Sequence, residues 1–255
     1  MQDAHIRMDS VNADISLLQR KNGLTYGTDA LLLASYIQGM HTDALELGTG
    51  TGIISLLLLK REKVKYVTGL EVQPDFARIT EQNAEINDAS DRLKSICCDL
   101  RDFNDQKKRD LIFSNPPYMK CDSGKPNFHD EKNIARHEVK GTILDFCKCA
   151  SRCLKFGGSF YVVYRSDRMM DLLCAMRECK IEPKRLTFVL ADEGSSPSMM
   201  LVEGKNGAAP GMKVTPPLIL YRDSKHTAYS DDYEYIYNTG NFPEKFRITN
   251  ARKEG

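Results

Sequence analysis

The chain has 255 residues, of which 41% are hydrophobic, and its formal net charge at pH 7 is +1. This length and apolar content allow one large hydrophobic core, or one core with a small extension. The near-zero charge excludes a global attraction to nucleic acid, so any such binding depends on a local patch. The longest largely apolar run, residues 53–59, is far shorter than the ~20 residues that span a bilayer. We expect a cytoplasmic protein without membrane association, because the amino terminus carries no signal-like apolar stretch.

Hairpin, cap and periodicity signals predict the elements of the chain. A strand begins at Ser16, Asn22-Gly23 forms a turn, and a second short strand reaches Tyr26. A helix then covers residues 28–37. Further strands are predicted at residues 44–47, 65–72, 93–99, 110–114, 159–165, 185–191, 198–203 and 217–221, and further helices at residues 53–60, 74–87, 142–156 and 167–179.

This alternation predicts an α/β fold with a doubly wound, mostly parallel sheet and helices on both faces. The glycines at 157 and 158 are expected to end the helix before them. Residues 204–211 are predicted to form a glycine-rich hairpin tip, and a closing hairpin makes the edge strand antiparallel. We divide the chain into an amino-terminal hairpin and helix extension, residues 1–40, packed on a core domain, residues 41–255.

The cysteines give no sign of a metal site. The chain has 8 of them, without a Cys-x-x-Cys pair and without ligand-spaced histidines. This pattern favours reduced, partly buried thiols, so we expect no metal.

The predicted strand at residues 110–114 stops at Asn115-Pro116-Pro117-Tyr118. Prolines lack an N–H group and fix φ, so the strand ends in a stiff extended turn. Open α/β sheets bind their ligands at the carboxyl ends of the strands. The Asn115 carboxamide oxygen and the Pro116 carbonyl are two acceptors beside the flat Tyr118 ring, which suits a planar –NH₂ group. On its own this motif fits a plain turn equally well.

The segment 46–52, Glu-Leu-Gly-Thr-Gly-Thr-Gly, follows a predicted strand and opens a helix, which is the context of a nucleotide-binding loop. Its glycine spacing differs from that of a dinucleotide site. A carboxylate just ahead of the first glycine would repel a pyrophosphate but attract a cationic ammonium or sulfonium. These features favour S-adenosylmethionine over a nicotinamide cofactor. The residues assigned to this ligand are Glu46, Gly48, Thr49, Gly50 and Gly52.

Acidic residues at the ends of the next two predicted strands extend the expected cofactor site. Glu71 is placed to accept from both ribose hydroxyls. Asp99 is placed to accept from the adenine amine, with Leu100 packed on the ring. Each acid alone is more often a cap or a solvated strand end, but their coincidence with the glycine loop and Asn115 favours a binding site. Thr28, Val72 and Asn115 complete the predicted cofactor contacts.

The glycine loop and the Asn-Pro-Pro-Tyr sequence resemble those of class I S-adenosylmethionine-dependent methyltransferases that act on amino nitrogens. A narrower resemblance, to the bacterial valine-tRNA adenine N6-methyltransferase family, is carried by residues 26–34, 71–74, 135–138, 203–205 and 216–218. This resemblance implies a Rossmann-like methyltransferase fold, S-adenosylmethionine as cofactor and tRNA as partner. It further implies methylation of the exocyclic N6 of the adenosine just 3′ of the anticodon in valine tRNA.

The expected mechanism assigns Asn115, Pro116 and Tyr118 as catalytic residues. They hold a base that has left its loop stack while its amine attacks the sulfonium methyl. Basic residues in the connection at 119–140 and on the later hairpin are expected to contact tRNA phosphates. Acids in that connection nearly cancel its charge, so a solvated loop is an equally good interpretation. The assigned substrate-binding residues are Pro117, Lys120, Arg136, His137 and Lys205.

Two other functions fit parts of the pattern. A protein glutamine presents the same two amide hydrogens, as in release-factor methylation, although those enzymes usually have a longer helical domain ahead of the glycine loop. A non-catalytic nucleotide-binding module is the alternative from a different class. We expect the chain to act as a monomer.

Overall fold

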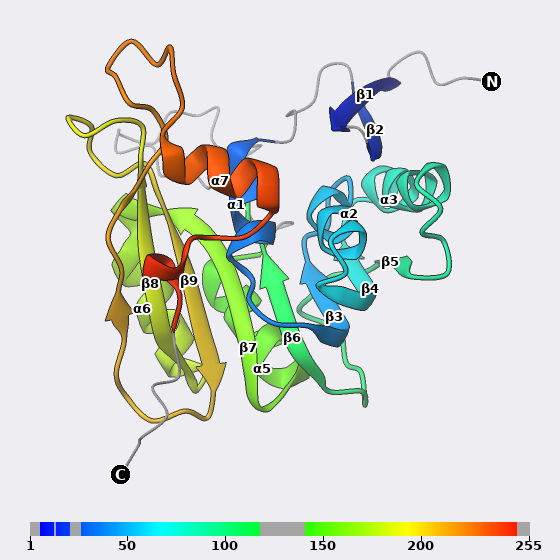
Figure 1. Cartoon of the computed structure of the whole chain (residues 1–255). Coiled ribbons are helices and arrows are strands. Elements are labelled where there is room, and N and C mark those ends of the chain that lie inside the picture. The colour runs from blue at the N-terminus through cyan, green and yellow to red at the C-terminus, as the bar shows by residue number, and fades with distance from the viewer. Residues whose placement is uncertain (1–5, 13, 21–26, 118–140, 249–255) are drawn as a thin grey trace, which may run out of the picture.

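The computed structural model describes residues 6–12, 14–20, 27–117 and 141–248 (Figure 1). These residues form a nine-stranded sheet with helices on both faces and a separate two-stranded sheet. The strands are β1 (Ile6–Asn12), β2 (Ile15–Arg20), β3 (His41–Leu47), β4 (Val64–Glu71), β5 (Leu93–Cys97), β6 (Arg109–Ser114), β7 (Leu154–Arg165), β8 (Ile181–Leu190), β9 (Met199–Asn206), β10 (Lys213–Val214) and β11 (Leu218–Ile219). The α-helices are α1 (Thr28–Tyr36), α2 (Ile53–Lys60), α3 (Pro74–Ile86), α5 (Ile143–Cys153), α6 (Met169–Glu178) and α7 (Asp231–Thr239).

The large sheet has the order β10-β8-β9-β7-β6-β3-β4-β5, and β11 also pairs with β8. The strands from β7 to β5 are parallel neighbours, whereas β9 is antiparallel to both β7 and β8. The chain proceeds outward from β3 to β4 and β5, then returns on the other side of β3 as β6. The strand order therefore reverses between β3 and β6, and such switch points are where open α/β sheets bind ligands. The predicted α/β fold with a mostly parallel sheet is confirmed.

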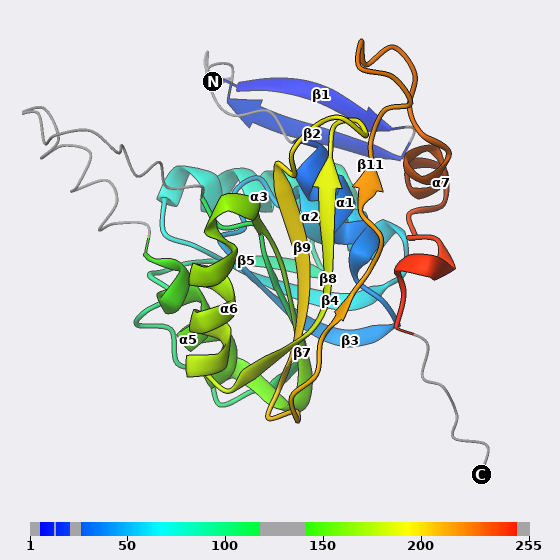
Figure 2. The same ribbon diagram turned by 90° about the vertical axis from the view of Figure 1, so that its left-hand side faces the viewer.

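Two hydrophobic clusters cover the two faces of the sheet. Side chains of a strand alternate between faces, so Leu111 and Phe113 of β6 join the cluster that contains α1 and α2, whereas Ile112 joins the cluster of α5 and α6. All three side chains are fully buried. Figure 2 shows α5 and α6 together on one side of the sheet, away from α1 and α7. Burial on both faces makes the parallel strands a rigid support for the loops at their ends.

The first hairpin differs from the predicted one. β2 begins at Ile15, near the predicted position, but it pairs with the earlier strand β1, which the sequence did not suggest. The expected turn at Asn22-Gly23 lies outside the described residues. Asn87 at the end of α3 holds β2 in place: its Oδ1 accepts from the Ser16 N–H at 3.0 Å, and its Nδ2 donates to the Ser16 carbonyl at 2.7 Å.

The helix predicted at 142–156 begins as expected but ends early. Thr142 caps α5 in a reciprocal capping box with Asp145. The helix stops before Leu154, because Leu154 already pairs with Arg109 in the sheet. The glycines at 157 and 158 therefore lie within β7 and do not cap the helix, which corrects the prediction.

The second hairpin is formed by β8 and β9, which are joined by residues 191–198. Residues 204–211 are not its tip, as the sequence had suggested. Residues 204–206 are the end of β9, and residues 207–211 lead toward β10, which is parallel to β8. No helix in the described part of the chain has the length and apolar character that crossing a bilayer requires.

Candidate active site

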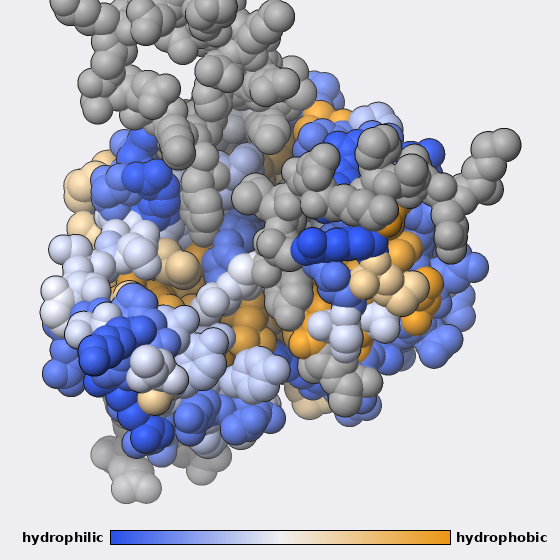
Figure 3. All heavy atoms as spheres, turned by 90° about the horizontal axis from the view of Figure 1, so that it is seen from above, coloured by the Kyte–Doolittle hydropathy of each residue, from blue (hydrophilic) through white to orange (hydrophobic). Residues whose placement is uncertain are grey.

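The carboxyl ends of neighbouring strands bring together residues that the sequence singled out. Leu47 of β3 is in register with Ser114 of β6, so Gly48 and Asn115, which follow them, lie next to each other at the switch point. The Ser114 hydroxyl donates to the Leu47 carbonyl at 2.7 Å and ties the two strand ends together. On the other side of β3, Glu71 is the last residue of β4. Figure 3 looks onto this edge, where apolar side chains lie among hydrophilic ones.

The glycine loop has the backbone that only glycine adopts easily. Gly48, Gly50 and Gly52 have φ values of 74°, 60° and 81°, in the left-handed region. The Leu70 carbonyl accepts from the Gly48 N–H at 2.9 Å, and Glu71 Oε2 accepts from the Gly50 N–H at 2.9 Å. A Cβ added to Gly50 would meet nothing within 4 Å. The loop therefore presents bare backbone to open space at Gly50.

Two predicted ligand contacts within this loop point the wrong way. Thr49 is 4% exposed, and its side chain fills the space beside Gly69, where an added Cβ would lie 2.2 Å from the threonine hydroxyl. Glu46 is 1% exposed and accepts a hydrogen bond from the Ser55 hydroxyl of α2. Burial raises the pKa of Glu46 to about 8, and the charge of Glu71 adds to the shift while the Ser55 hydrogen bond opposes it. This corrects the expectation that Glu46 offers an exposed carboxylate to a cationic ligand.

The acids at the ends of β4 and β5 have local partners. Glu71 is 6% exposed, and its Oε1 accepts from the Gln73 N–H at 2.9 Å. Asp99 accepts from the Arg101 backbone N–H at 2.9 Å and from the Arg101 guanidinium, whose hydrogen bonds lower the pKa of Asp99. Leu100 is buried against the cluster of α5 and α6. Glu71 Oε2 has one hydrogen-bond donor among the described residues, the Gly50 N–H, and keeps acceptor capacity for a ligand. Both oxygens of Asp99 accept from Arg101, so a ligand donor at Asp99 competes with the Arg101 side chain.

Asn115 is held by a residue that sequence reasoning missed. Its Nδ2 donates to Asp29 Oδ2 at 2.8 Å, across 86 residues of sequence. The other oxygen of Asp29 accepts from the Ala30 N–H at 2.9 Å, at the start of α1. Pro116 is buried and Pro117 is half-buried. In the sequence, Asp29 was part of a helix start and of the segment 26–34 that carries the family resemblance, and neither assigned it to the site.

The other residues predicted to bind cofactor or substrate lie in different parts of the structure. Thr28 is the first residue of α1 and is half-buried. Val72 directly follows β4 and is half-buried. Lys205 pairs with Ser159 in the first half of β7, and β9 runs away from the carboxyl ends of the parallel strands. Lys205 therefore lies away from the strand-end site, and its predicted place beside the substrate is wrong. The other predicted residues lie outside the described ranges: Tyr118, Lys120, Arg136 and His137.

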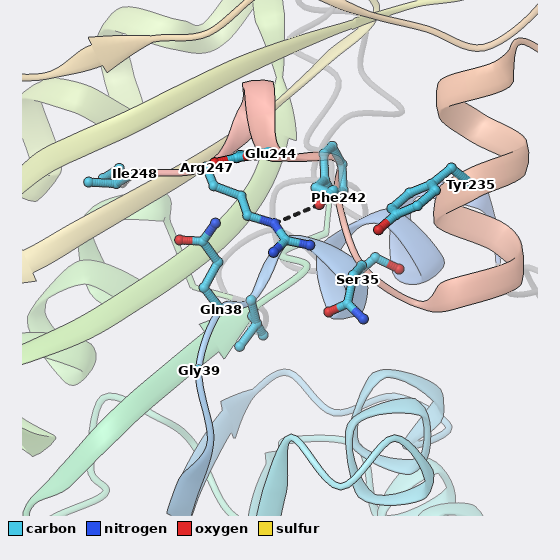
Figure 4. Close-up of a pocket in the computed structure, with 10 residues that line it drawn as sticks. Ser35, Gln38, Gly39, Tyr235, Phe242, Glu244, Arg247 and Ile248 are labelled. Atoms are coloured by element: carbon cyan, nitrogen blue, oxygen red, sulfur yellow. Dashed lines mark hydrogen bonds between the residues drawn. The ribbon is translucent and has the colours of Figure 1, made fainter. Parts of the chain in front are cut away.

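A pocket of about 400 Å³ lies near the carboxyl end of α1 (Figure 4). Ser35, Gln38 and Arg247 line it, and the Arg247 Nε donates to the Phe242 carbonyl at 2.7 Å. Gly39, also in the lining, precedes β3, whereas the glycine loop follows β3. This pocket is therefore separate from the strand-end site and contains none of its residues. Over the described residues, no group of three or more histidine, cysteine or acidic side chains is arranged to hold a metal ion.

A methyltransferase family and several curated methyltransferases match this chain in sequence. Residues 21–181 match the model of the methyltransferase small domain family. The tRNA1(Val) (adenine(37)-N6)-methyltransferase of Phocaeicola vulgatus is 30% identical over 187 residues, which cover 70% of this chain and 76% of the relative. The protein of the same name from Bacteroides thetaiotaomicron is 29% identical over 185 residues, 71% of this chain and 77% of the relative.

Two solved structures share the fold at low sequence identity. A predicted O-methyltransferase from Agrobacterium tumefaciens has a TM-score of 0.68 and 20% identity, covering 85% of this chain and 98% of its own. A T. thermophilus 16S rRNA methyltransferase, in complex with AdoMet and guanosine, has a TM-score of 0.59 and 16% identity, covering 80% of this chain and 51% of its own. At these identities the likeness concerns the fold alone.

The fold and the strand-end site define a methyltransferase. More narrowly, the chain belongs to the methyltransferase small domain family, and it shares a family with the tRNA1(Val) (adenine(37)-N6)-methyltransferases. The resemblance predicted from the sequence is confirmed.

Proposed function

We propose that this chain transfers a methyl group from S-adenosylmethionine to the exocyclic N6 of an adenosine in tRNA, at the position just 3′ of the anticodon in valine tRNA. The names of its relatives support the substrate. The observation that carries the proposal is the Asn115 carboxamide at the switch point, next to the glycine loop, with its nitrogen bound to Asp29. This leaves the carboxamide oxygen as an acceptor for an amino group.

The residues at the strand ends fit the cofactor. Gly50 offers backbone without a side chain to a ligand, and Glu71 Oε2 keeps a lone pair for a hydroxyl donor. Asp99 at the end of the neighbouring strand accepts from Arg101, whose place a ligand amine would take. We assign Glu71 to the ribose hydroxyls, Asp99 to the adenine amine and Leu100 to the adenine ring. S-Adenosylmethionine, when bound, supplies an electrophilic methyl group on its sulfonium.

The protein's own part is to hold and orient the acceptor amine. The Asn115 carboxamide oxygen and the Pro116 carbonyl accept its two hydrogens, so that the nitrogen lone pair faces away from both. Tyr118 is assigned to stack on the base. Fixed acceptors and correct orientation are worth several orders of magnitude in rate without a titrating base. The pair of acceptors also excludes a base that presents no –NH₂ group.

We assign the contacts with tRNA phosphates to Lys120, Arg136 and His137. Such contacts make affinity fall with salt, with a slope proportional to the number of phosphates neutralised. We expect tRNA binding to weaken by about 10-fold or more between low and moderate salt, measured by filter binding. Salt-independent binding would instead support the solvated-loop interpretation.

A labelled-methyl assay tests the proposed reaction. Purified protein and labelled S-adenosylmethionine are incubated with unmodified valine tRNA, and separately with a release factor. The expected product is N6-methyladenosine in the tRNA, found by nucleoside analysis, and it disappears when the adenosine 3′ of the anticodon is replaced by guanosine. Label in a release-factor glutamine and none in tRNA would overturn the proposal.

Variants then test the assigned roles. Asn115→Ala should lower turnover by about 100-fold or more, because it removes an acceptor for the amine, and should leave cofactor affinity within about two-fold. Asn104→Ala is the matched control, because Asn104 is an exposed carboxamide in the segment between β5 and β6. Equal loss of cofactor binding and turnover in Asn115→Ala would contradict the assignment.

A further inference from the structure

The hydrogen bond between α1 and the Asn115 side chain has a specific geometry. Asp29 is the second residue of α1, and its two oxygens have different partners: Oδ1 accepts from the Ala30 N–H at 2.9 Å and Oδ2 accepts from Asn115 Nδ2 at 2.8 Å. Gly27 makes room for this carboxylate, since a Cβ there would lie 2.5 Å from Asp29 Oδ1. A residue with a side chain at position 27 would therefore displace Asp29.

A carboxamide presents a donor and an acceptor in nearly the same shape, so its orientation must be fixed by its neighbours. A carboxylate only accepts hydrogen bonds, so Asp29 selects the orientation in which the Asn115 nitrogen faces it. The Asn115 oxygen then points the other way. Among the residues that the structure describes, none donates to that oxygen in a recorded hydrogen bond, which leaves it available to an amino group.

We propose that Asp29 is a positioning residue that orients the Asn115 carboxamide so that its oxygen accepts from the substrate amine. This inference rests on the proposed function of the Asn115 site. Asp29 acts through Asn115 and is not assigned any contact with the substrate itself.

Both ends of this contact stand on rigid supports. α1 is anchored by the fully buried Leu32 and Leu33, which pack into the same cluster as α2 and β6. Asn115 follows Ser114, whose hydroxyl binds the Leu47 carbonyl of the neighbouring strand. A carboxylate in the first turn of a helix is also favoured by the helix dipole. The contact therefore joins two fixed elements and can hold a side chain to within the tolerance that catalysis requires.

The isosteric variant Asp29→Asn tests the inference sharply. An asparagine at 29 cannot accept from both Ala30 N–H and Asn115 Nδ2. If its oxygen stays with Ala30, its nitrogen attracts the Asn115 oxygen and turns the carboxamide over, so a donor faces the substrate amine. We expect kcat to fall by about 10-fold or more with cofactor affinity nearly unchanged. The matched control is Asp75→Asn, because Asp75 is the second residue of α3, binds Arg20 and Arg78, and is exposed.

Exchanging the side chains of Asp29 and Asn115 tests whether Asp29 orients the carboxamide or only stabilises the fold. Asn115→Asp alone sets two carboxylates against each other at the Asp29 contact. In the double variant Asp29→Asn/Asn115→Asp, the new asparagine accepts from the Ala30 N–H and donates to the new aspartate, whose second oxygen accepts from the amine. We expect the double variant to be at least about 10-fold more active than Asn115→Asp alone, because the orientation is restored. If activity losses simply multiply, so that the double variant is the least active, the inference is overturned.

A measurement that needs no substrate keeps this inference apart from the proposed function. The Asn115 side-chain amide signals of isotope-labelled protein are assigned by their absence in Asn115→Ala. We expect these protons to exchange slowly with water in the wild-type protein and faster in Asp29→Ala. In the control Asp75→Asn they should exchange at the wild-type rate. Unchanged exchange in Asp29→Ala refutes the contact whatever the activity. Protected amide protons in a protein that methylates no adenosine would instead overturn the proposed function and leave Asp29 as an orienting residue for another acceptor.

Discussion

Glu46 makes the stability of this protein depend on pH in an unusual direction. It lies within the parallel sheet at 1% exposure, with the Ser55 hydroxyl as its hydrogen-bond donor. Burial raises its pKa from the ordinary value of 4.5 to about 8, so the carboxyl is protonated in the folded chain at neutral pH. In the unfolded chain the same group is solvated and ionised.

The sign follows from proton binding. Between the unfolded and folded pKa values the folded state binds the proton and the unfolded state does not, so stability falls as the pH rises. This group's contribution is fully present below the unfolded pKa and is lost as the pH rises through the folded one. Between the two pKa values the free energy of unfolding falls by about 1.4 kcal/mol per pH unit because of this group, which amounts to about 3 kcal/mol between about pH 5 and about pH 7.5.

Glu46→Gln removes the titrating group at nearly constant shape, and its amide oxygen can still accept from Ser55. We expect the free energy of unfolding, measured in denaturant, to be similar for the variant and the wild type near pH 5. Near pH 7.5 the variant should be the more stable, by up to about 3 kcal/mol. Glu85→Gln, at an exposed position of α3, is the control and should follow the wild type. A variant-minus-wild-type difference that stays flat between these pH values would refute the reasoning.

Three further substitutions test the loop, the core and the hairpin. Gly50→Ala imposes a side chain on a residue with left-handed backbone, so we expect the folded state to lose about 1 kcal/mol. The loss in binding free energy of S-adenosylhomocysteine, measured by calorimetry, should be larger than this loss in stability. Unchanged affinity would exclude Gly50 from the cofactor site. Arg185→Met leaves the buried Glu203 without its ion-pair partner, so unfolding in denaturant should show a loss of about 3–5 kcal/mol, and a neutral result would contradict the pair's importance. Asn87→Ala removes both hydrogen bonds to Ser16, so amides of β2 should exchange faster by mass spectrometry while those of β6 do not; equal change in both strands would indicate global destabilisation.

Local chemistry explains what the sequence predicted correctly. Glycines at alternating positions after an apolar strand need no distant partner to form a left-handed turn, and Gly48, Gly50 and Gly52 all adopt it. Two successive prolines end a strand wherever it lies, and β6 stops just before Asn115. Because successive parallel strands end at one edge, their order along the chain was enough to bring these residues together.

The sequence predictions were wrong for residues whose position depends on the direction of a strand or on the face of the sheet to which a side chain points. β9 is antiparallel, so its last residues, Lys205 among them, lie away from the site. Periodicity does not reveal the direction in which a strand pairs. Glu46 alternates with Leu45 and Leu47, which face α5, so its carboxyl must enter the opposite buried face beside α2. A strand buried on both faces leaves no solvent side for an acid, and this constraint could have been drawn from the sequence.

The amino-terminal segment is more closely tied to the site than the division at residue 40 suggests. Ile15, Leu17 and Leu32 are buried in the same cluster as α2, β4 and β6, so this segment and the sheet share one core. Asp29 reaches from this segment to the carboxamide of Asn115, the residue that directly follows β6. Because a carboxamide needs an external partner to distinguish its two ends, the strand-end motif is incomplete without α1. The functional unit therefore begins at Gly27 at the latest, ahead of the glycine loop and of the sheet that carries it.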